Sequence, residues 1–450
     1  MNRRDLIVTA AAAAGAPKLA FSQTSESLEK ALWSAIFGGQ NAFTQAQELL
    51  LKESDPALVF PLIIAQRFAR VPSGWFDLEM QRLAGEEREG WFDWMLWQEE
   101  RSDLTPPEWY YRFKRDMYLQ IDPNFDDFLQ LEALQPEAAR IRFEEVTWGG
   151  VRKDGIPSLD FPELIDAGEA GYLRDDDLVF GVSINGDTRA YPLRIMGWHE
   201  MFNEVIGGVP VALAYCTLCG SGILFETQLE DRAEPFIFGS SGFLYRSNKL
   251  MFDRETNTLW NQFTGEPVIG ELAQSGIRLK QQPVVIAPWS EWRAQNPDTL
   301  VLSLNTGHNR NYGSGVVYKD YFGSPNLMFP TAVNEVPMKQ KDYVFGIREY
   351  GAAKAWPLTA FKDRRVINDR IGQTNVVLIG DEAGRTVRAY ERGNLEFAWE
   401  NGPVSGGAWQ VTEAALTGPG GQNLPRVAGH VAYWFAWSGY LGDVAELWTE

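Results

Sequence analysis

The chain has 450 residues, 45% of them hydrophobic, and a formal net charge of −19. A negative charge of this size repels phosphate backbones and anionic lipid headgroups, so we expect no nucleic-acid partner and no binding to an anionic membrane. The chain contains only two cysteines, so a disulfide framework cannot hold the fold, but 17 Trp and 26 Phe are enough for an ordinary core.

Residues 1–23 are predicted to form an export signal. Arg3 and Arg4 precede a short, weakly apolar, alanine-rich stretch, and Lys18 follows it. This pattern is closer to a twin-arginine signal than to a general secretory signal. The stretch is well short of the ~20 apolar residues that span a bilayer. No later segment is long and apolar enough either, so we predict an exported, periplasmic protein without a transmembrane segment.

Residues 24–140 are predicted to form an all-α domain, either a helical bundle or a repeat-like array. Leu28, Leu32 and Ile36 recur at helical spacing, and the pair Asp55-Pro56 is typical of a helix start. A further stripe of large apolar side chains lies at Trp91, Trp94 and Trp97. Such stripes usually face a core. We therefore interpret this domain as a scaffold or partner surface without chemistry of its own.

From about residue 140 the composition changes to short β-branched and aromatic runs separated by glycine. Residues 146–151 and 154–157 are examples. This composition is typical of strands and turns. The fold class predicted for the whole chain is therefore α+β, with a β-rich module after the helices.

The β-rich region contains an internal duplication. Of the 37 positions in 179–215, 12 are identical to those in 344–380, at one constant offset and without a gap. Later positions match at a shorter offset, so the first copy carries extra residues between its two matching blocks. We predict a first copy at 141–315 and a second, degenerate copy at 316–450, packed as a pseudo-symmetric α+β body.

The two copies differ at the positions that could carry chemistry. Cys216, Cys219, His199 and Glu200 correspond in the second copy to Asp381, Gly384, Arg364 and Arg365, in that order. Positions kept in both copies are those that the shared fold needs. We therefore predict one site, built on the first copy, with the second copy as support or as a wall.

A helix at 195–205 followed by a strand at 209–215 would bring the candidates of this site together. The helix rises ~1.5 Å per residue and the strand returns at ~3.3 Å per residue, so the end of the strand lies near the start of the helix. On this geometry His199 lies in the first turn of the helix. Its imidazole is then expected within reach of Cys216 and Cys219.

A Cys-x-x-Cys-Gly turn can hold a metal ion through both thiolates. With His199 as a third ligand, the fourth position falls to Glu200, another oxygen ligand or water. Glu200 could instead transfer protons. Three protein ligands with an open position are typical of a reactive metal site, and sulfur and nitrogen ligands favour copper or zinc, with iron next.

Two other roles for Cys216 and Cys219 stay open. A thiol-disulfide redox pair is one, although residues 220–225 read as a turn and a strand and not as the helix that usually lowers the pKa of a reactive cysteine. A structural disulfide is the other, but it would close too small a loop to stabilise the fold much. The remaining histidines, His308 and His430, are interpreted as surface or core-edge residues.

A polar cluster in residues 245–265 contains Asp253 and Arg254. Asx-turns and an Asp-Arg pair that hold a hairpin would explain it. The alternative is a polar wall beside the cysteines, in which Asp253 and Arg254 act on a substrate.

Several motifs resemble the bacterial domain-of-unknown-function family 3179 (DUF3179). They lie at 148–151, 154–157, 190–193, 198–200, 215–220, 252–254, 259–260, 306–307 and 434–437. The resemblance covers about 141–450 and leaves out the helical region. It implies that the histidine, the cysteine pair and the Asp-Arg hairpin belong to one shared module, but it implies no activity.

Together these patterns predict an exported metal-binding protein, and a metal-dependent oxidoreductase more than a hydrolase. Its partner would be a small molecule or another protein. The alternatives are a thiol-disulfide redox protein and a non-catalytic periplasmic protein for binding or assembly.

Overall fold

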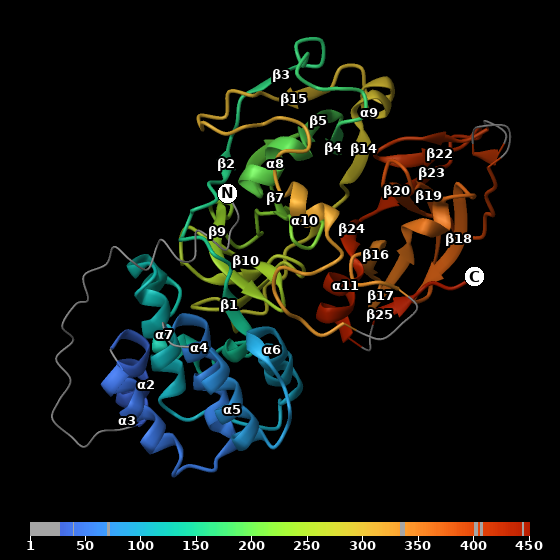
Figure 1. Cartoon of the computed structure of the whole chain (residues 1–450). Helices are drawn as coiled ribbons and strands as arrows, with labels where there is room; N and C mark the ends of the chain where they lie inside the picture. The colour runs from blue at the N-terminus through green and yellow to red at the C-terminus, as the bar shows by residue number, and fades with distance from the viewer. Residues whose placement is uncertain are drawn as a thin grey trace.

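The structure is a computed structural model and describes residues 28–38, 40–69, 73–333, 338–399, 404–405, 408–442 and 445–450. It contains helices and five sheets, which confirms the α+β class (Figure 1). The predicted export signal lies outside the described residues. Within them, none of the helices is long and apolar enough to cross a bilayer.

The first part of the described chain is helical. Its helices are α2 (Leu28–Phe37), α3 (Gln40–Leu50), α4 (Val59–Phe68), α5 (Ser73–Ala84), α6 (Gly90–Glu100) and α7 (Tyr110–Leu119). Short 3-10 turns are η1 (Pro56–Leu58), η2 (Pro123–Asp127), η3 (Leu131–Leu134) and η4 (Phe143–Glu145). The Asp55 carboxylate accepts a hydrogen bond from the Ala57 N–H, which confirms the predicted helix start. Trp94 and Trp97 are fully buried, as their spacing predicts.

The helices pack against a sheet and do not form a core of their own. This sheet has the order β1-β9-β10-β11-β12, with β1 (Val146–Trp148), β9 (Phe238–Tyr245), β10 (Asn248–Asp253), β11 (Leu259–Asn261) and β12 (Glu266–Ile269). Figure 1 shows the helices gathered beside β1 and β10. Phe128 of the helical part contacts Phe243 and Phe252 of the sheet, and all three belong to one buried cluster. The expected boundary near residue 140 therefore runs through a shared core.

Two further sets of strands follow, here called the first and second strand sets. The first set contains β4 (Leu178–Ile184), β5 (Asp187–Pro192), α8 (Leu193–His199), β6 (Met201–Ile206), β7 (Val209–Cys216), β8 (Ser221–Glu226), β14 (Val285–Pro288), α9 (Trp289–Gln295) and β15 (Leu300–Leu302). Edge strands β2 (Leu159–Asp160), β3 (Leu164–Asp166) and β13 (Gln281–Gln282) complete its sheets. Their orders are β13-β8-β7-β6-β2 and β14-β4-β5-β15-β3.

The second strand set repeats this arrangement after α10 (Lys319–Gly323). It contains β16 (Tyr343–Glu349), β17 (Ala352–Pro357), η5 (Leu358–Phe361), β18 (Val366–Ile371), β19 (Thr374–Asp381), β20 (Thr386–Glu391), β24 (His430–Tyr433), α11 (Trp434–Leu441) and β25 (Ala445–Leu447). Short strands β21 (Gln410–Val411), β22 (Ala415–Thr417) and β23 (Asn423–Val427) extend one sheet. The sheet orders are β24-β16-β17-β25 and β18-β19-β20-β23-β22-β21.

Strand pairs in the two sets have the same register. Val179 lies opposite Pro192 in the β4–β5 pair, and Val344 lies opposite Pro357 in the β16–β17 pair. The β6–β7 and β18–β19 pairs agree in the same way, as do β7–β8 and β19–β20. Because a slip of one residue would turn every side chain to the other face, equal registers place equivalent residues on equivalent faces.

Two residue types that are kept at equivalent positions also make the same contacts. Asn203 bonds through its amide to both the N–H and the C=O of Phe238, and Asn368 does the same to Phe397. Likewise, Gly181 and Gly346 each lie directly against a tryptophan ring, where a Cβ atom would overlap it. These positions serve the packing of each set.

The helix expected at 195–205 is wrong in its second half. Helix α8 ends at His199, Glu200 adopts a left-handed conformation with φ 55°, and the chain continues as strand β6. Pairing of β6 with β7 supplies the backbone hydrogen bonds that a longer helix would have made within itself. His199 therefore lies in the last turn of α8, not in the first.

Candidate functional site

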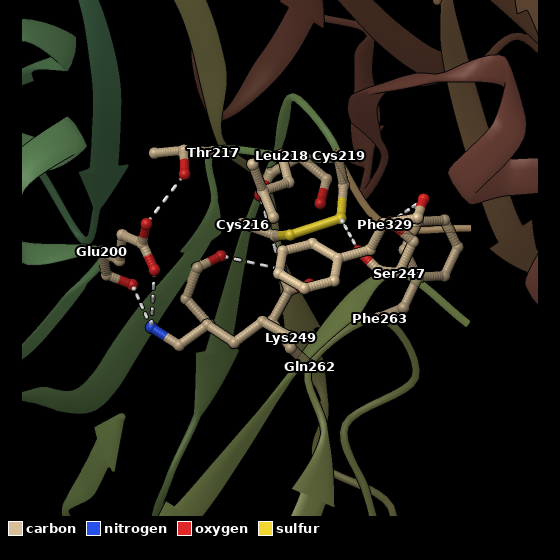
Figure 2. Close-up of a disulfide and its surroundings, with 12 residues drawn as sticks. Glu200, Cys216, Thr217, Leu218, Cys219, Ser247, Lys249, Gln262, Phe263 and Phe329 are labelled. Atoms are coloured by element: carbon tan, nitrogen blue, oxygen red, sulfur yellow. Dashed lines mark hydrogen bonds and ion pairs between the residues drawn. A yellow bond between two sulfur atoms is a disulfide. The ribbon is translucent and has the colours of Figure 1, made fainter. Parts of the chain in front are cut away.

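The two cysteines close the turn between β7 and β8 as a disulfide. Cys216 is the last residue of β7, Cys219 lies within the turn, and their Cα atoms are 5.3 Å apart (Figure 2). The Cys219 N–H donates to the Cys216 carbonyl at 3.1 Å. Gly220 follows with φ 61°, a left-handed conformation that glycine adopts without strain. The turn is thus closed by both a covalent bond and a backbone hydrogen bond.

Segments distant in the sequence cover this turn. The Tyr321 hydroxyl donates to the Leu218 carbonyl at 2.6 Å, and the Tyr433 N–H donates to the Cys219 carbonyl at 2.7 Å. Cys219 Sγ lies 3.6 Å from the Ser247 carbonyl oxygen. Cys216 is 2% exposed and Cys219 is 0% exposed. The disulfide is therefore enclosed by both strand sets and by the sheet that carries Ser247.

A buried acid and a buried amine lie beside the turn. The Glu200 carboxylate accepts hydrogen bonds from the hydroxyls of Thr217 at 2.7 Å and Tyr318 at 2.8 Å. Lys249 Nζ donates to the Glu200 carbonyl at 3.1 Å and lies 3.6 Å from the Glu200 carboxylate. Burial lowers the pKa of Lys249, and the negative charge of Glu200 opposes that shift. Glu200 thus connects the cysteine turn, through Thr217, to the amine (Figure 2).

A small cavity lies between these groups. Its volume is about 30 Å³, and Cys216, Thr217, Glu200 and Lys249 are among the residues that line it. A cavity of that size holds about one water molecule. Of the two cysteines, Cys216 is the one that lines this space.

His199 is turned toward other partners. Its Nδ1 donates to the Pro157 carbonyl at 2.9 Å, and its Nε2 accepts from the Tyr312 hydroxyl at 2.6 Å. Its ring centroid is 5.2 Å from that of His308. Burial lowers the pKa of His199 to about 4, and the positive charges of His308 and Arg310 act in the same direction. Both ring nitrogens are thus engaged away from the cysteines.

Asp253 and Arg254 lie at the far end of strand β10 from Ser247. Asp253 is fully buried and accepts hydrogen bonds from the backbone and hydroxyl of Thr256 and from the Trp260 indole N–H. Arg254 does not pair with Asp253; it binds Asp154 through two hydrogen bonds of 2.9 and 3.0 Å. The structure does not bring these two residues to the cysteines, and their contacts are those that hold a hairpin.

The predicted metal ligands have other partners in this arrangement. The sulfurs are bonded to each other, and His199 and Glu200 are hydrogen-bonded as described above. Among the described residues, no group of three or more His, Cys, Asp or Glu side chains is arranged to hold a metal ion. Cysteine binds a metal ion as a free thiolate, so these two sulfurs could serve as ligands only after the disulfide is reduced.

Lys249, Tyr318 and Tyr321 were not predicted from the sequence to lie beside the disulfide. Lys249 lies in β10, all of whose residues are buried, and a lysine in a buried strand is the signal that could have revealed it. Gln262 belongs to the polar cluster of residues 245–265, for which a place beside the cysteines was one of the two alternatives, and it donates to the Ala214 carbonyl at 2.8 Å beneath the turn (Figure 2). Tyr318 and Tyr321 come from the segment between the strand sets, whose position no local pattern predicts.

Comparison with known proteins gives one result. The chain matches the family described as "Protein of unknown function (DUF3179)" over residues 153–444. No curated protein and no solved structure matches it significantly. The matched region is well over half of the chain and contains the cysteine turn, Glu200, Lys249 and His199. The chain therefore belongs to the DUF3179 family.

Proposed function

We propose that this protein is a thiol-disulfide redox protein in which Cys216 and Cys219 form the active pair. The observation that carries the proposal is that the only two cysteines of the chain are bonded to each other beside a buried lysine and glutamate. A buried lysine whose pKa is lowered, next to a reactive sulfur, is typical of functional sites. A bonded pair also agrees with the predicted export, because oxidising compartments preserve disulfides.

The chemistry starts from the reduced pair. The Cys216 thiolate, stabilised by the Lys249 ammonium group across the shared cavity, attacks one sulfur of a partner disulfide. The partner S–S bond breaks, a mixed disulfide forms, and the other partner sulfur leaves as a thiolate. The Cys219 thiol then loses its proton and attacks Cys216 Sγ, which releases the second partner sulfur as a thiol. Two electrons pass from the cysteine pair to the partner, and the two thiol protons follow them. Lys249 and Glu200 are the groups placed to move these protons.

We further infer that the two strand sets are copies of one module. Equal strand registers, the paired Asn203 and Asn368 contacts and the glycine-tryptophan contacts support this inference. In the second copy the position of Cys216 is taken by Asp381, so the module folds without sulfur. The cysteines are then present for reactivity, and the helices at 28–134 are a scaffold for the first copy.

Metal binding remains a proposal for the reduced form of the protein. In that form the thiolates of Cys216 and Cys219 would be the first two ligands, and His199 or Glu200 would have to leave its present partner to become the third. Zinc or copper would be held as a Lewis acid or redox ion. Titration of the reduced protein with zinc tests this directly: one bound ion, lost in Cys216→Ser, would replace the redox proposal.

The redox proposal is tested by the rate at which the reduced pair is reoxidised by a small aromatic disulfide, followed from the released thiol. We expect Lys249→Met to slow the reaction at pH 7 at least about tenfold, because the thiolate loses its neighbouring cation. Lys354→Met is the matched control, since Lys354 is also buried and ion-paired, with Asp369 at 3.0 Å, but lies in the second strand set. Equal rates in Lys249→Met and Lys354→Met would contradict the role of Lys249. A disulfide that cannot be reduced while the protein stays folded would contradict the proposed thiol-disulfide function.

A further inference from the structure

A second, larger cavity lies away from the disulfide. Its volume is about 610 Å³, and its lining residues come from three places: the chain around β12 and β13 (264–281), the β16–β17 hairpin (348–353) and Leu441 at the end of α11. Small-molecule sites usually have volumes of about 300 to 1,000 Å³, so this groove is large enough for a metabolite. None of the residues that line the small cavity beside Cys216 lines it.

Three cationic side chains line this groove, although the chain as a whole is strongly acidic. They belong to Arg278, Lys280 and Arg348. Lys280 is neutralised by Glu226 at 2.7 Å. In the part of the chain that the structure describes, Arg278 and Arg348 have no carboxylate within the 4.0 Å of an ion pair. These two guanidinium groups therefore form no ion pair in the described structure, although the carboxylates of Glu266 and Glu349 lie near enough to Arg348 to oppose the lowering of its pKa by burial.

Arg348 is held in place with part of its hydrogen-bonding capacity unused. One terminal nitrogen donates to the Phe263 carbonyl at 2.6 Å, while Nε is buried and has no partner in the described structure. Burial lowers the pKa of Arg348 to about 10, and the positive charge of Arg278 contributes. The side chain is still a cation at neutral pH. A buried donor without an acceptor is unfavourable, so an acceptor that reaches it from the groove would be bound favourably.

The other lining groups define the kind of ligand. The hydroxyl oxygen of Thr264 is buried and has no partner among the described residues. Leu279, Ala352, Ala353 and Leu441 supply apolar surface in the same groove. Glu349 also lines it and is the acidic group that a bound anion must avoid. A planar guanidinium binds carboxylate or phosphate oxygens with paired hydrogen bonds.

We propose that this groove binds a small organic anion, whose carboxylate or phosphate group is held by Arg348 and Arg278 and whose apolar part lies against Leu279 and Leu441. The Thr264 hydroxyl donates to the same oxyanion. The site is independent of the redox proposal, because it uses no residue of the cysteine turn.

The test is calorimetric titration of the full chain at constant ionic strength with benzoate and with phenyl phosphate, which share an apolar ring and differ in the oxyanion. Benzamide, which has the ring but no charge, is the control ligand. We expect saturable 1:1 binding of at least one anion and none of benzamide. The anion that binds with the higher affinity shows whether the natural ligand of the groove carries a carboxylate or a phosphate.

Three variants decide whether the binding belongs to this groove. Arg348→Gln and Arg278→Gln should each weaken it about tenfold, as for loss of a paired ionic hydrogen bond. Arg278 is exposed and makes no ion pair in the described structure, so its variant should keep the fold. Arg293→Gln, an exposed arginine outside the groove, should bind as the unchanged protein does. Absence of saturable binding, or equal affinity in Arg278→Gln, would overturn the proposal.

Discussion

The hairpins β7–β8 and β19–β20 have the same register but close their turns differently. In the first, a disulfide joins Cys216 to Cys219. In the second, the Asp381 carboxylate accepts a hydrogen bond from the Gly384 N–H at 2.8 Å and pairs with Arg365 at 2.7 Å. The residues that follow Cys219 and Gly384 both have a left-handed backbone, with φ 61° at Gly220 and 52° at Arg385. The turn thus needs one cross-connection, and a carboxylate provides it as well as sulfur does.

The surroundings of the two turns differ more than the turns themselves. In the first strand set, the chain between β8 and β14 forms β9 to β12, a sheet that joins β1 and carries Lys249 to the disulfide. In the second set, the chain between β20 and β24 forms β21 to β23, which extends the sheet of β18 to β20. The corresponding segments of the two strand sets therefore differ: one forms a separate sheet beside the disulfide, and the other widens an existing sheet.

The largest expected effect tests what the two strand sets share. A Cβ atom on Gly181 would lie 2.2 Å from Trp292, and one on Gly346 would lie 1.9 Å from Trp437. Both rings are fully buried, so Gly181→Ala and Gly346→Ala should each lower the free energy of unfolding by about 3 kcal/mol. Urea unfolding measures the change. Gly168→Ala is the control, since nothing lies within 4 Å of its Cβ. A neutral effect in one set would break the equivalence.

The next effect concerns the paired asparagines. Asn203→Ala and Asn368→Ala each remove two hydrogen bonds to the backbone of Phe238 or Phe397, and they leave the N–H and C=O of that residue without partners. We expect a loss of about 2 to 3 kcal/mol for each. Asn375→Ala, which removes one exposed bond to the Gly393 carbonyl, should cost under about 1 kcal/mol. Urea unfolding again decides, and a large difference between the first two variants would argue against equivalent roles.

The sequence predicts the shared features well and the site only in part. Internal comparison indicates which positions serve the fold, because Pro192, Asn203 and their counterparts are kept in both halves. Strand composition also separates the helical part from the β-rich part. The bond between Cys216 and Cys219 could not be separated from metal ligation, because both chemistries use the same spacing. Lys249 was missed because its contact with Glu200 depends on how two distant strands pack.

His199 was placed near the cysteines because the helix was extended too far. Residues 201–206 contain enough apolar and β-branched residues to read as either a helix or a strand, and pairing with β7 decides for the strand. With the helix one turn shorter, His199 faces Pro157 and Tyr312. A single misplaced boundary thus gave a predicted ligand the wrong partners.

Because only the first strand set contains this histidine, we expect the two sets to differ in how they make the free energy of unfolding depend on pH. His199 has a pKa of about 4 in the folded chain and about 6.5 when unfolded, so the unfolded chain binds more protons as the pH falls through this interval. Its contribution to stability is therefore present above pH 6.5 and is lost as the pH falls toward 4. The second set has Arg364 at the corresponding position and therefore lacks this imidazole.

His199→Gln isolates this contribution. Between pH 7 and pH 5 the unchanged protein should lose about 2 kcal/mol of unfolding free energy more than the variant does. His308→Gln is the control, because His308 is exposed. Equal losses in the unchanged protein and in His199→Gln would show that His199 titrates normally in the folded chain.

The smallest effect comes from opening the two turns. Cys216→Ser with Cys219→Ser removes a disulfide that closes a very short loop, which should cost about 2 kcal/mol. Asp381→Ala removes a hydrogen bond and a half-exposed ion pair and should cost about 1 kcal/mol. Asp381→Asn, which keeps an acceptor for the Gly384 N–H, should lose less than Asp381→Ala. Thermal unfolding of the three variants measures these differences. A cysteine-free chain that still folds cooperatively would show, as we expect, that the first turn can close its hairpin without sulfur, as the second turn does.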